Sequence, residues 1–417
     1  MIGLYFGTAL FIMKEEIAVK EYYLSELLEL KYGKDHKTLG NGTIPCYGSG
    51  GVIRYVNNSL YEKESILIPR KGSLNNLFFI NKPFWTVDTL FWSIINEKIV
   101  LPRYLFYKLK NLNLSSFNEG SAVPSLTTKT LNKISIKIHD LKLQEKIVSI
   151  LSSLDEKIEL NRKINQNLEE TAQTLFKRWF IDFEFPNEEG KPYKSSDGKL
   201  IESELGEIPE GWRVGKLGEI VEINPRENLK KLEKKIYIEM KCLSETSSII
   251  SEYYEREFTG TGTKFKNKDT LMARITPCLE NRKIGYVNFL KDNDIGWGST
   301  EFNILRSQNN IPRELSYFIA RSKKFLDYAI SNMNGSSGRQ RVSGKTLEEY
   351  NIVISSENIY KKFGKVSNTI MNQIENNRKE IEKLMELRDY LLPRLMSGEV
   401  NVSNLKISGI SNSDKSN

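Results

Sequence analysis

The stretch NRKINQNLEETAQTLFKRWF, residues 161–180, decides the organisation of this chain, because it returns 216 positions later as NRKEIEKLMELRDYLLPRLM, residues 377–396. At the same offset the tripeptide KTL stands at 129–131 and again at 345–347. A repeating unit of about 210 residues is far too long for a solenoid repeat. The sequence therefore predicts a duplicated pair of domains with pseudo-two-fold symmetry.

The composition narrows the class of protein. A chain of 417 residues can bury the cores of two or more domains. Its net charge of +8 favours an acidic partner, and nucleic acid comes before an anionic membrane because no basic amphipathic helix stands out. Three cysteines lie far apart without CxxC spacing, and there are only two histidines. These counts argue against a disulfide framework, a zinc site or a histidine-based triad, and a reducing cytoplasm fits best.

The first residues, MIGLYFGTALFIM, are apolar but too short to cross a bilayer. They lack the basic start and the cleavage site of a signal peptide. Because a more ordinary start follows at Met13, we expect Met13 to be the true N-terminus, and we expect no membrane partner.

The pattern along the chain predicts an α+β fold in which two mixed α/β domains alternate with two long helices. Short β-branched and aromatic runs separated by Gly and Asn indicate strands, whereas apolar residues at 3/4 spacing, almost without Gly or Pro, indicate the seam of a coiled coil. The expected segments are a first domain at 14–140, a helix at 141–182, a polar linker at 183–204, a second domain at 205–356, a helix at 357–398 and a disordered tail at 399–417.

Asn161 and Asn377 occupy equivalent positions on the two helical seams. If the helices pair antiparallel about a pseudo-dyad, these asparagines meet near its centre and fix the register. The alternative is that both face solvent at a bend. A helix pair of this kind is a spacer that holds two domains apart, as in dimeric DNA readers whose half-sites lie about 34 Å apart.

A series of short motifs runs in order along nearly the whole chain. They are YGSGGVIRY (47–55), SILIPRKGS (65–73), FWTVDTLFW (84–92), GSAVPSLTTKTLNKISIKI (120–138), LGEIPEGW (205–212), DTLMARITPCLENRKIG (269–285), GWGSTEF (296–302) and LLPRLMSGEV (391–400). Together with the duplicated order, they resemble the specificity subunit of Type I restriction-modification systems.

The resemblance implies two target-recognition domains, each reading one half of a split site on double-stranded DNA, with the helices setting the gap. It implies no catalytic activity and no bound cofactor for this chain. Two DNA methyltransferase subunits and, in the full complex, restriction subunits would dock on it and would use S-adenosylmethionine, ATP and Mg. Pro69 departs from the family, which often has a small residue there, and the second half lacks the YGSGG loop. An asymmetric target is therefore expected.

Candidate DNA contacts in the first half surround two loops. Arg70 follows a strand and could meet phosphates or a guanine edge, or the turn could simply be solvated. The glycine loop could let the backbone approach DNA closely, or it could be an ordinary turn. The predicted contacts are Tyr47, Ser49, Gly50, Arg70, Lys71, Ser73 and Thr86.

Candidate contacts in the second half are more basic. The loop GSSGRQRVSG (335–344) carries Arg and Gln side chains that can read guanine and adenine. Its counterpart at 120–128 has no basic residue, so base reading there is less secure. The predicted contacts are Arg274, Thr276, Asn281, Arg282, Lys283, Ser299, Thr300, Arg339, Gln340 and Arg341.

Other functions remain as alternatives or are disfavoured. GRQRVSGKT is similar to a Walker A loop, but Arg339 stands where that loop needs glycine, so a nucleotide-binding enzyme is disfavoured. A specificity subunit serving a Type IIB-like methyltransferase-nuclease stays open. So does a coiled-coil scaffold that binds proteins, which would lack the steep salt dependence of DNA binding.

Overall fold

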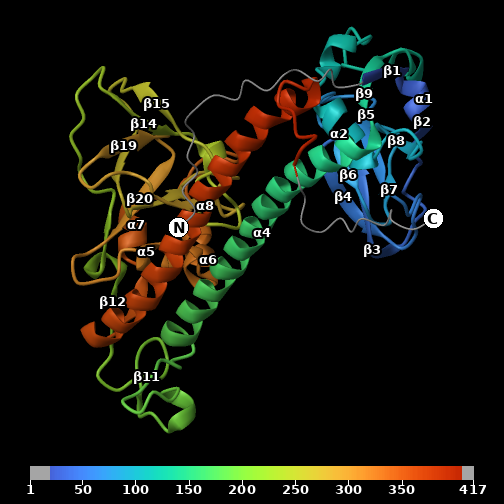
Figure 1. Ribbon diagram of the computed structural model, residues 1–417. Helices are drawn as coiled ribbons and strands as arrows, with labels where there is room; N and C mark the ends of the chain where they lie inside the picture. The colour runs from blue at the N-terminus through green and yellow to red at the C-terminus, as the bar shows by residue number, and fades with distance from the viewer. Residues whose placement is uncertain (1–18, 406–417) are drawn as a thin grey trace. The chain divides into compact units, whose positions relative to one another are not determined.

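The computed structural model describes residues 19–405, which form two compact units. Unit 1 contains the described residues up to Lys157 and those from Leu384, and unit 2 contains Ile158–Lys383. The long helices α4 (Leu141–Phe180) and α8 (Glu357–Ser397) each contribute to both units (Figure 1). The predicted start at Met13 lies outside the described residues.

Unit 1 is built on a four-stranded antiparallel sheet of order β2-β8-β5-β6. A second sheet has the order β4-β3-β7, with β3 and β7 parallel, and β1 pairs with β9. Its elements are β1 (Val19–Tyr23), α1 (Leu24–Leu27), β2 (Leu28–Tyr32), β3 (Asn41–Gly48), β4 (Gly51–Val56), β5 (Ser65–Pro69), β6 (Phe78–Ile80), β7 (Trp85–Thr86), β8 (Leu90–Ile95), α2 (Pro102–Lys110), η1 (Leu114–Phe117), α3 (Thr128–Asn132) and β9 (Ser135–His139).

The central strand β5 explains the core of unit 1. All five of its residues, SILIP, are buried, as expected for a short continuous apolar run covered on both faces. Helix α2 starts with Pro102 in its first turn, where proline is tolerated, and buries Tyr104, Leu105 and Leu109. These residues share one hydrophobic core with β5.

Unit 2 repeats this arrangement, with one more strand in its second sheet. Its four-stranded sheet has the order β13-β20-β17-β18, its second sheet has the order β15-β14-β19-β16 with β14 and β19 parallel, and β12 pairs with β21. Its elements are η2 (Lys194–Ser196), β10 (Leu200–Ile201), β11 (Ile208–Pro209), β12 (Arg213–Lys216), η3 (Leu217–Glu219), β13 (Val221–Ile223), β14 (Lys234–Ile238), η4 (Met240–Cys242), β15 (Tyr254–Glu257), β16 (Thr263–Lys266), β17 (Thr270–Ala273), β18 (Ile284–Tyr286), β19 (Ile295–Gly298), β20 (Phe302–Ser307), α5 (Leu315–Arg321), α6 (Lys323–Ser331), α7 (Gly344–Glu348) and β21 (Asn351–Ile354).

The short helices α3 and α7 show the duplication at the level of single hydrogen bonds. Each is capped by a hydroxyl that accepts from a backbone N–H three residues later, Thr127 from Thr130 at 3.2 Å and Ser343 from Thr346 at 3.0 Å. The predicted repeat and the predicted alternation of mixed domains with long helices are therefore confirmed.

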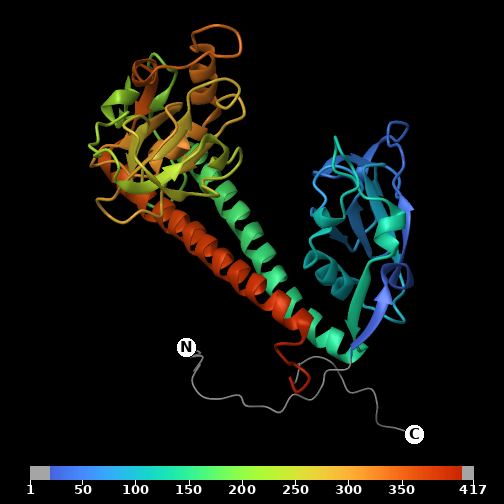
Figure 2. The ribbon, with the colours of Figure 1, turned by 90° about the horizontal axis from the view of Figure 1, so that it is seen from above.

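The long helices pack side by side and run antiparallel, as predicted (Figure 2). Within unit 2, Asn165 of α4 accepts from Asn377 of α8 at 2.8 Å, and further along α4 the ring of Phe180 stacks on Tyr360 at 5.6 Å between centroids. The partner's number falls as the number along α4 rises, which defines the antiparallel sense. Within unit 1, Arg388 of α8 donates to Asp155 of α4 at 3.0 Å.

The seam asparagines are buried, but their partners differ from the predicted ones. Asn161 is 1% exposed and donates to Glu380 at 2.8 Å, and Asn377 is 5% exposed and donates to Asn165. Each asparagine thus bonds to a residue about one helical turn from the expected partner. Burial also excludes the alternative that both face solvent. Val366, an apolar residue of α8, is 44% exposed.

A tyrosine ties the helical layer of each unit to the long helices. In unit 1 the hydroxyl of Tyr107 on α2 donates to Asp155 of α4 at 2.6 Å. In unit 2 the hydroxyl of Tyr317 on α5 donates to Glu169 of α4 at 2.5 Å, and Glu169 also accepts from the backbone N–H of Ser248. These bonds anchor each mixed domain to its helices.

The segments predicted as linker and tail contain packed residues. In the former, β10 pairs with β11, and Phe185 stacks on both Tyr193 and Trp212 with centroids 4.6 and 4.9 Å away. In the latter, Val402 is buried in the core of unit 1. The remainder of the predicted tail, from residue 406, lies outside the described residues. Across residues 19–405, no helix is both long and apolar enough to cross a membrane.

Candidate nucleic-acid interface

Each unit joins three segments at the end of a central buried strand. In unit 1 the backbone N–H of Arg70, just after β5, donates to Thr89 O at 2.9 Å, and Leu126 N–H donates to Arg70 O at 2.9 Å. In unit 2 Arg274, just after β17, donates in the same way to Glu301 O at 2.9 Å and accepts from Val342 at 3.0 Å. Arg70 and Arg274 therefore hold equivalent positions.

In unit 1 the glycine loop predicted from the sequence lies against the turn that carries Arg70. Asn76 donates its side-chain N–H to Ser49 O at 2.8 Å. A Cβ on Gly72, which has a φ of +90°, would stand 3.5 Å from Ser49 Oγ. Gly50 and Gly51 have open space where a Cβ would stand. The predicted residues Ser49, Gly50, Lys71 and Ser73 thus belong to two adjoining surface turns.

The charge of Arg70 is already engaged in unit 1. Its guanidinium lies over the ring of Tyr32, 5.3 Å from the centroid, and it donates to Asp88 O at 3.2 Å. The carboxylate of Asp88 is 3.9 Å away.

Two predicted contacts of unit 1 face the interior instead. The Thr86 side chain is 0% exposed, and its hydroxyl donates to Tyr47 O at 3.2 Å. Tyr47 packs on Phe78 with centroids 5.8 Å apart, and burial raises the pKa of its phenol. Tyr47 and Thr86 are paired in the register of β3 with β7, so their side chains lie on the same face of the sheet, and that face is buried.

In unit 2 the loop before α7 is fixed to the same strand end. Thr276 N–H donates to Gln340 O at 3.1 Å, and Asn334 pairs with Arg341 through two backbone hydrogen bonds. The Arg341 guanidinium donates two hydrogen bonds to the Glu301 carboxylate, from Nη2 to Oε1 at 2.7 Å and from Nε to Oε2 at 2.8 Å. The hydrogen bond from Arg341 lowers the pKa of Glu301 below its ordinary value, so the pair is ionic at neutral pH. Arg339 is exposed.

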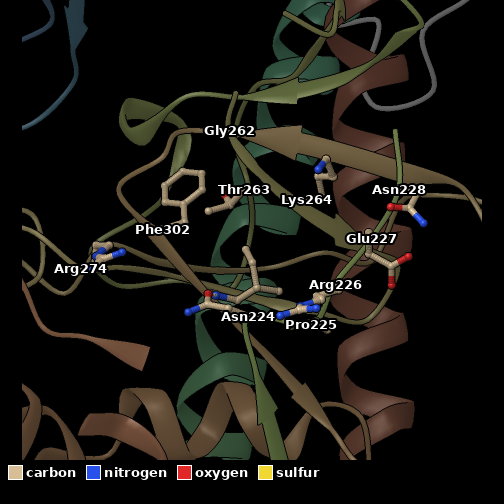
Figure 3. Close-up of a pocket in the computed structure, with 11 residues that line it drawn as sticks. Asn224, Pro225, Arg226, Glu227, Asn228, Gly262, Thr263, Lys264, Arg274 and Phe302 are labelled. Atoms are coloured by element: carbon tan, nitrogen blue, oxygen red, sulfur yellow. Dashed lines mark hydrogen bonds between the residues drawn. The ribbon is translucent and has the colours of Figure 1, made fainter. Parts of the chain in front are cut away.

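A pocket of about 400 Å³ opens beside this loop (Figure 3). Asn224, Arg226, Lys264 and Arg274 line it, together with Phe302. Within residues 19–405, no acidic side chain forms an ion pair with these three cations, and Arg274 Nε is buried without a hydrogen-bond partner. Cationic side chains that lack an acidic partner within ion-pair distance suit an anionic ligand such as a phosphate.

The acidic residue that lines the pocket, Glu227, is neutralised by two cations of the protein. Glu227 bonds to Lys266 at 2.8 Å and to Arg306 at 2.7 Å. Asn224 bonds to Asn303 at 3.0 Å and accepts from Ile304 N–H at 2.9 Å, which fixes its amide at the rim. The pocket therefore presents positive charge on a rigid frame.

Comparisons with known proteins agree with this architecture. The family model described as "Type I restriction modification DNA specificity domain" matches residues 17–170 and again residues 209–386. The chain belongs to this family. The two matches reproduce the duplication, one on each half of the sequence.

Relatives of the Type I specificity family cover most of the chain. The MjaIX specificity subunit of Methanocaldococcus jannaschii is 28% identical over 83% of this chain and 80% of its own length. The HindI specificity subunit of Haemophilus influenzae is 27% identical over 79% of this chain and 85% of its own. The crystal structure of the S subunit from M. genitalium shares the fold, with a TM-score of 0.57 and 17% identity over 92% of this chain and 97% of that one.

The remaining predicted contacts of unit 2 fall into two groups, one beside the pocket and one on the turn before β18. Thr263, which lines the pocket, donates its hydroxyl to Ser299 O at 2.8 Å, and Thr300 beside it is exposed. Asn281 and Arg282 are exposed on the turn before β18, and Lys283 O accepts from Ala273 N–H at 3.0 Å.

Sequence reasoning missed Asn224, Arg226 and Lys264 as members of the site. The signal was present for two of them, because NPRE follows directly on strand β13, and polar residues at strand ends often carry function. Lys264 could not be found in this way, since its strand β16 joins the pocket only through the fold of the second sheet.

Proposed function

We propose that this chain is the DNA-recognition subunit of a Type I restriction-modification complex and that it reads a bipartite, asymmetric site on double-stranded DNA. One observation carries the proposal: the same strand-end arrangement occurs in both units but with different side chains, Arg70 with Thr89 and Ser125 in one and Arg274 with Glu301 and Arg341 in the other. Two like-built readers with unlike surfaces suit two unlike half-sites.

The chain is proposed to act without catalysis of its own, in the cytoplasm. It would position two methyltransferase subunits and, in the full complex, restriction subunits. S-adenosylmethionine, ATP and Mg would be bound by those partners, and no cofactor by this chain. Membership of the specificity family and the relatives' printed names support this division of labour.

The test is to co-express the chain with its neighbouring methyltransferase gene in an unmethylated host and to map N6-methyladenine across the genome. A split motif with a fixed gap and two different halves is expected. A palindromic or continuous motif would contradict the asymmetric two-reader proposal. No methylation and no co-purifying methyltransferase would favour a protein-binding scaffold.

A further inference from the structure

Arg341 differs from the other candidate cations because an acid holds its guanidinium in a fixed plane. Glu301 accepts from Nε and Nη2 of this one side chain, and Nη1 donates to Arg339 O at 3.1 Å. A bidentate pair with a carboxylate fixes the orientation of the guanidinium as well as stabilising it. The Arg341 side chain nevertheless remains 40% exposed.

The donors that remain free can be counted. Arginine has five N–H groups in a rigid fork. Glu301 takes the one on Nε and one on Nη2, and the Arg339 carbonyl takes one on Nη1. Each terminal nitrogen therefore keeps one N–H, and both belong to a side chain that reaches solvent.

Guanine presents two acceptors, O6 and N7, in the major groove, and the two terminal nitrogens of the Arg341 fork each keep one N–H group for them. Resting on the proposed function, we propose that Arg341 reads a guanine in the half-site of unit 2 and that Glu301 is the positioning residue that aims it.

A backbone phosphate fits Arg341 less well than a guanine edge does. The Glu301 carboxylate already neutralises the guanidinium and would repel a second anion placed next to it. A guanine edge offers neutral acceptors and avoids this repulsion. Arg339, on the same loop, is exposed and lacks an acidic partner among the described residues, so it suits a phosphate instead.

Unit 1 carries no equivalent reader in its described part. The isolated backbone bridge of Lys71 with Ser125 corresponds to that of Ile275 with Arg341, which puts Ser125 in the place of Arg341. Thr89 stands in the place of Glu301. Among the described residues, the arginine–glutamate pair therefore occurs in unit 2 only, so it would read a base in only one half-site.

The experiment maps N6-methyladenine in an unmethylated host that co-expresses the methyltransferase with wild-type or variant chain. The variants are Arg341→Ala, Arg341→Lys, Glu301→Gln and, as a matched control, Arg339→Ala. Lysine keeps the charge and can still pair with Glu301, but it lacks the fork. Thermal unfolding of each purified complex shows whether it folds like the wild type.

We expect both Arg341 variants to relax one guanine position of one half-site. Preference for guanine there should fall about 5- to 150-fold, the range expected when one bidentate pairing with a base is removed. Glu301→Gln should relax the same position to a smaller extent, and Arg339→Ala should leave the motif unchanged while lowering the overall level of methylation.

The inference is overturned if folded Arg341→Lys keeps the wild-type motif, or if the relaxed position is not a guanine. If the Arg341 variants relax the guanine position but Glu301→Gln keeps the wild-type motif, Glu301 does not position Arg341. A wild-type chain that yields no split motif would instead overturn the proposed function itself, and this inference with it.

Discussion

Arg70 and Arg274 show how the same position can serve differently in two halves of one chain. Arg70 lies over Tyr32 and next to Asp88, so its charge is partly balanced within the protein. Arg274 lines a pocket together with Arg226 and Lys264, and its Nε is buried without a hydrogen-bond partner. The pocket of unit 2 is thus the stronger candidate for a backbone phosphate.

At this scale we predict that Arg274→Gln and Lys264→Gln weaken DNA binding without altering the recognised motif. Removing one cation that binds a phosphate should make the plot of log affinity against log salt concentration shallower by about 0.9. Binding of the purified complex to a duplex that carries its methylation motif, titrated at several salt concentrations, measures this slope.

Lys266→Gln is the matched control, because Lys266 is already paired with Glu227 at 2.8 Å. Its effect on the slope should be smaller than that of Lys264→Gln. Equal slopes for both variants would mean that the pocket does not hold a phosphate.

The helix pair depends on a buried amide pair, Asn165 with Asn377. Asn377→Leu alone leaves the Asn165 acceptor buried without that donor and should cost about 1–3 kcal/mol in the free energy of unfolding. Replacing both by leucine removes the two polar groups together and should restore most of this loss. Chemical denaturation of the single and double variants measures the difference. A double variant no more stable than Asn377→Leu would contradict the pairing.

A second prediction concerns strand β9 and helix α2 of unit 1. Burial lowers the pKa of His139 to about 4, and Tyr104 bonds to its Nδ1 at 2.6 Å. Below the ordinary pKa near 6.5 the unfolded chain binds a proton that the folded chain does not, so the stability from this group falls as pH drops from about 6.5 to about 4.

The variant His139→Gln should therefore lose less stability over that range of pH than the wild type. Thermal unfolding at pH 7, 5.5 and 4.5 compares the two proteins, since all other titratable groups are the same in both. Parallel pH profiles would contradict a neutral buried His139.

The elements themselves could largely be predicted from the sequence, because apolar periodicity is a local property. The first long helix was expected at 141–182 and spans Leu141–Phe180. The equivalence of Arg70 with Arg274 could not be predicted, since the two units differ in loop length between the repeated motifs and only the strand pairing aligns them. The ion pair of Arg341 with Glu301 could not be predicted either, because the two residues lie 40 positions apart in sequence. The burial of Thr86 was missed because its strand has only two residues, too few to show an alternation of apolar and polar side chains.

At the scale of the whole molecule, the helices are proposed to act as a ruler between half-sites. One heptad inserted into α4 and one into α8, each at the boundary between the two units, adds about 10.5 Å of helix with little rotation of the seam. Under the proposed function, the gap of the methylated motif should grow by about three base pairs, at 3.4 Å each.

The half-sites should stay the same in the heptad variant, since neither strand-end site is altered. Methylome sequencing of wild type and variant gives both the gap and the half-sites. An unchanged gap in a folded, methylating complex would refute the ruler.

The core of unit 1 includes Leu392, Leu395, Met396 and Val402, near the other end of the chain. During synthesis, residues 158–383 of unit 2 have all emerged before these side chains are made. The half of the protein translated first is therefore the half completed last. Until residues 392–402 leave the ribosome, the core of unit 1 lacks the side chains that this segment supplies, which reverses the usual order in which domains fold as they are made.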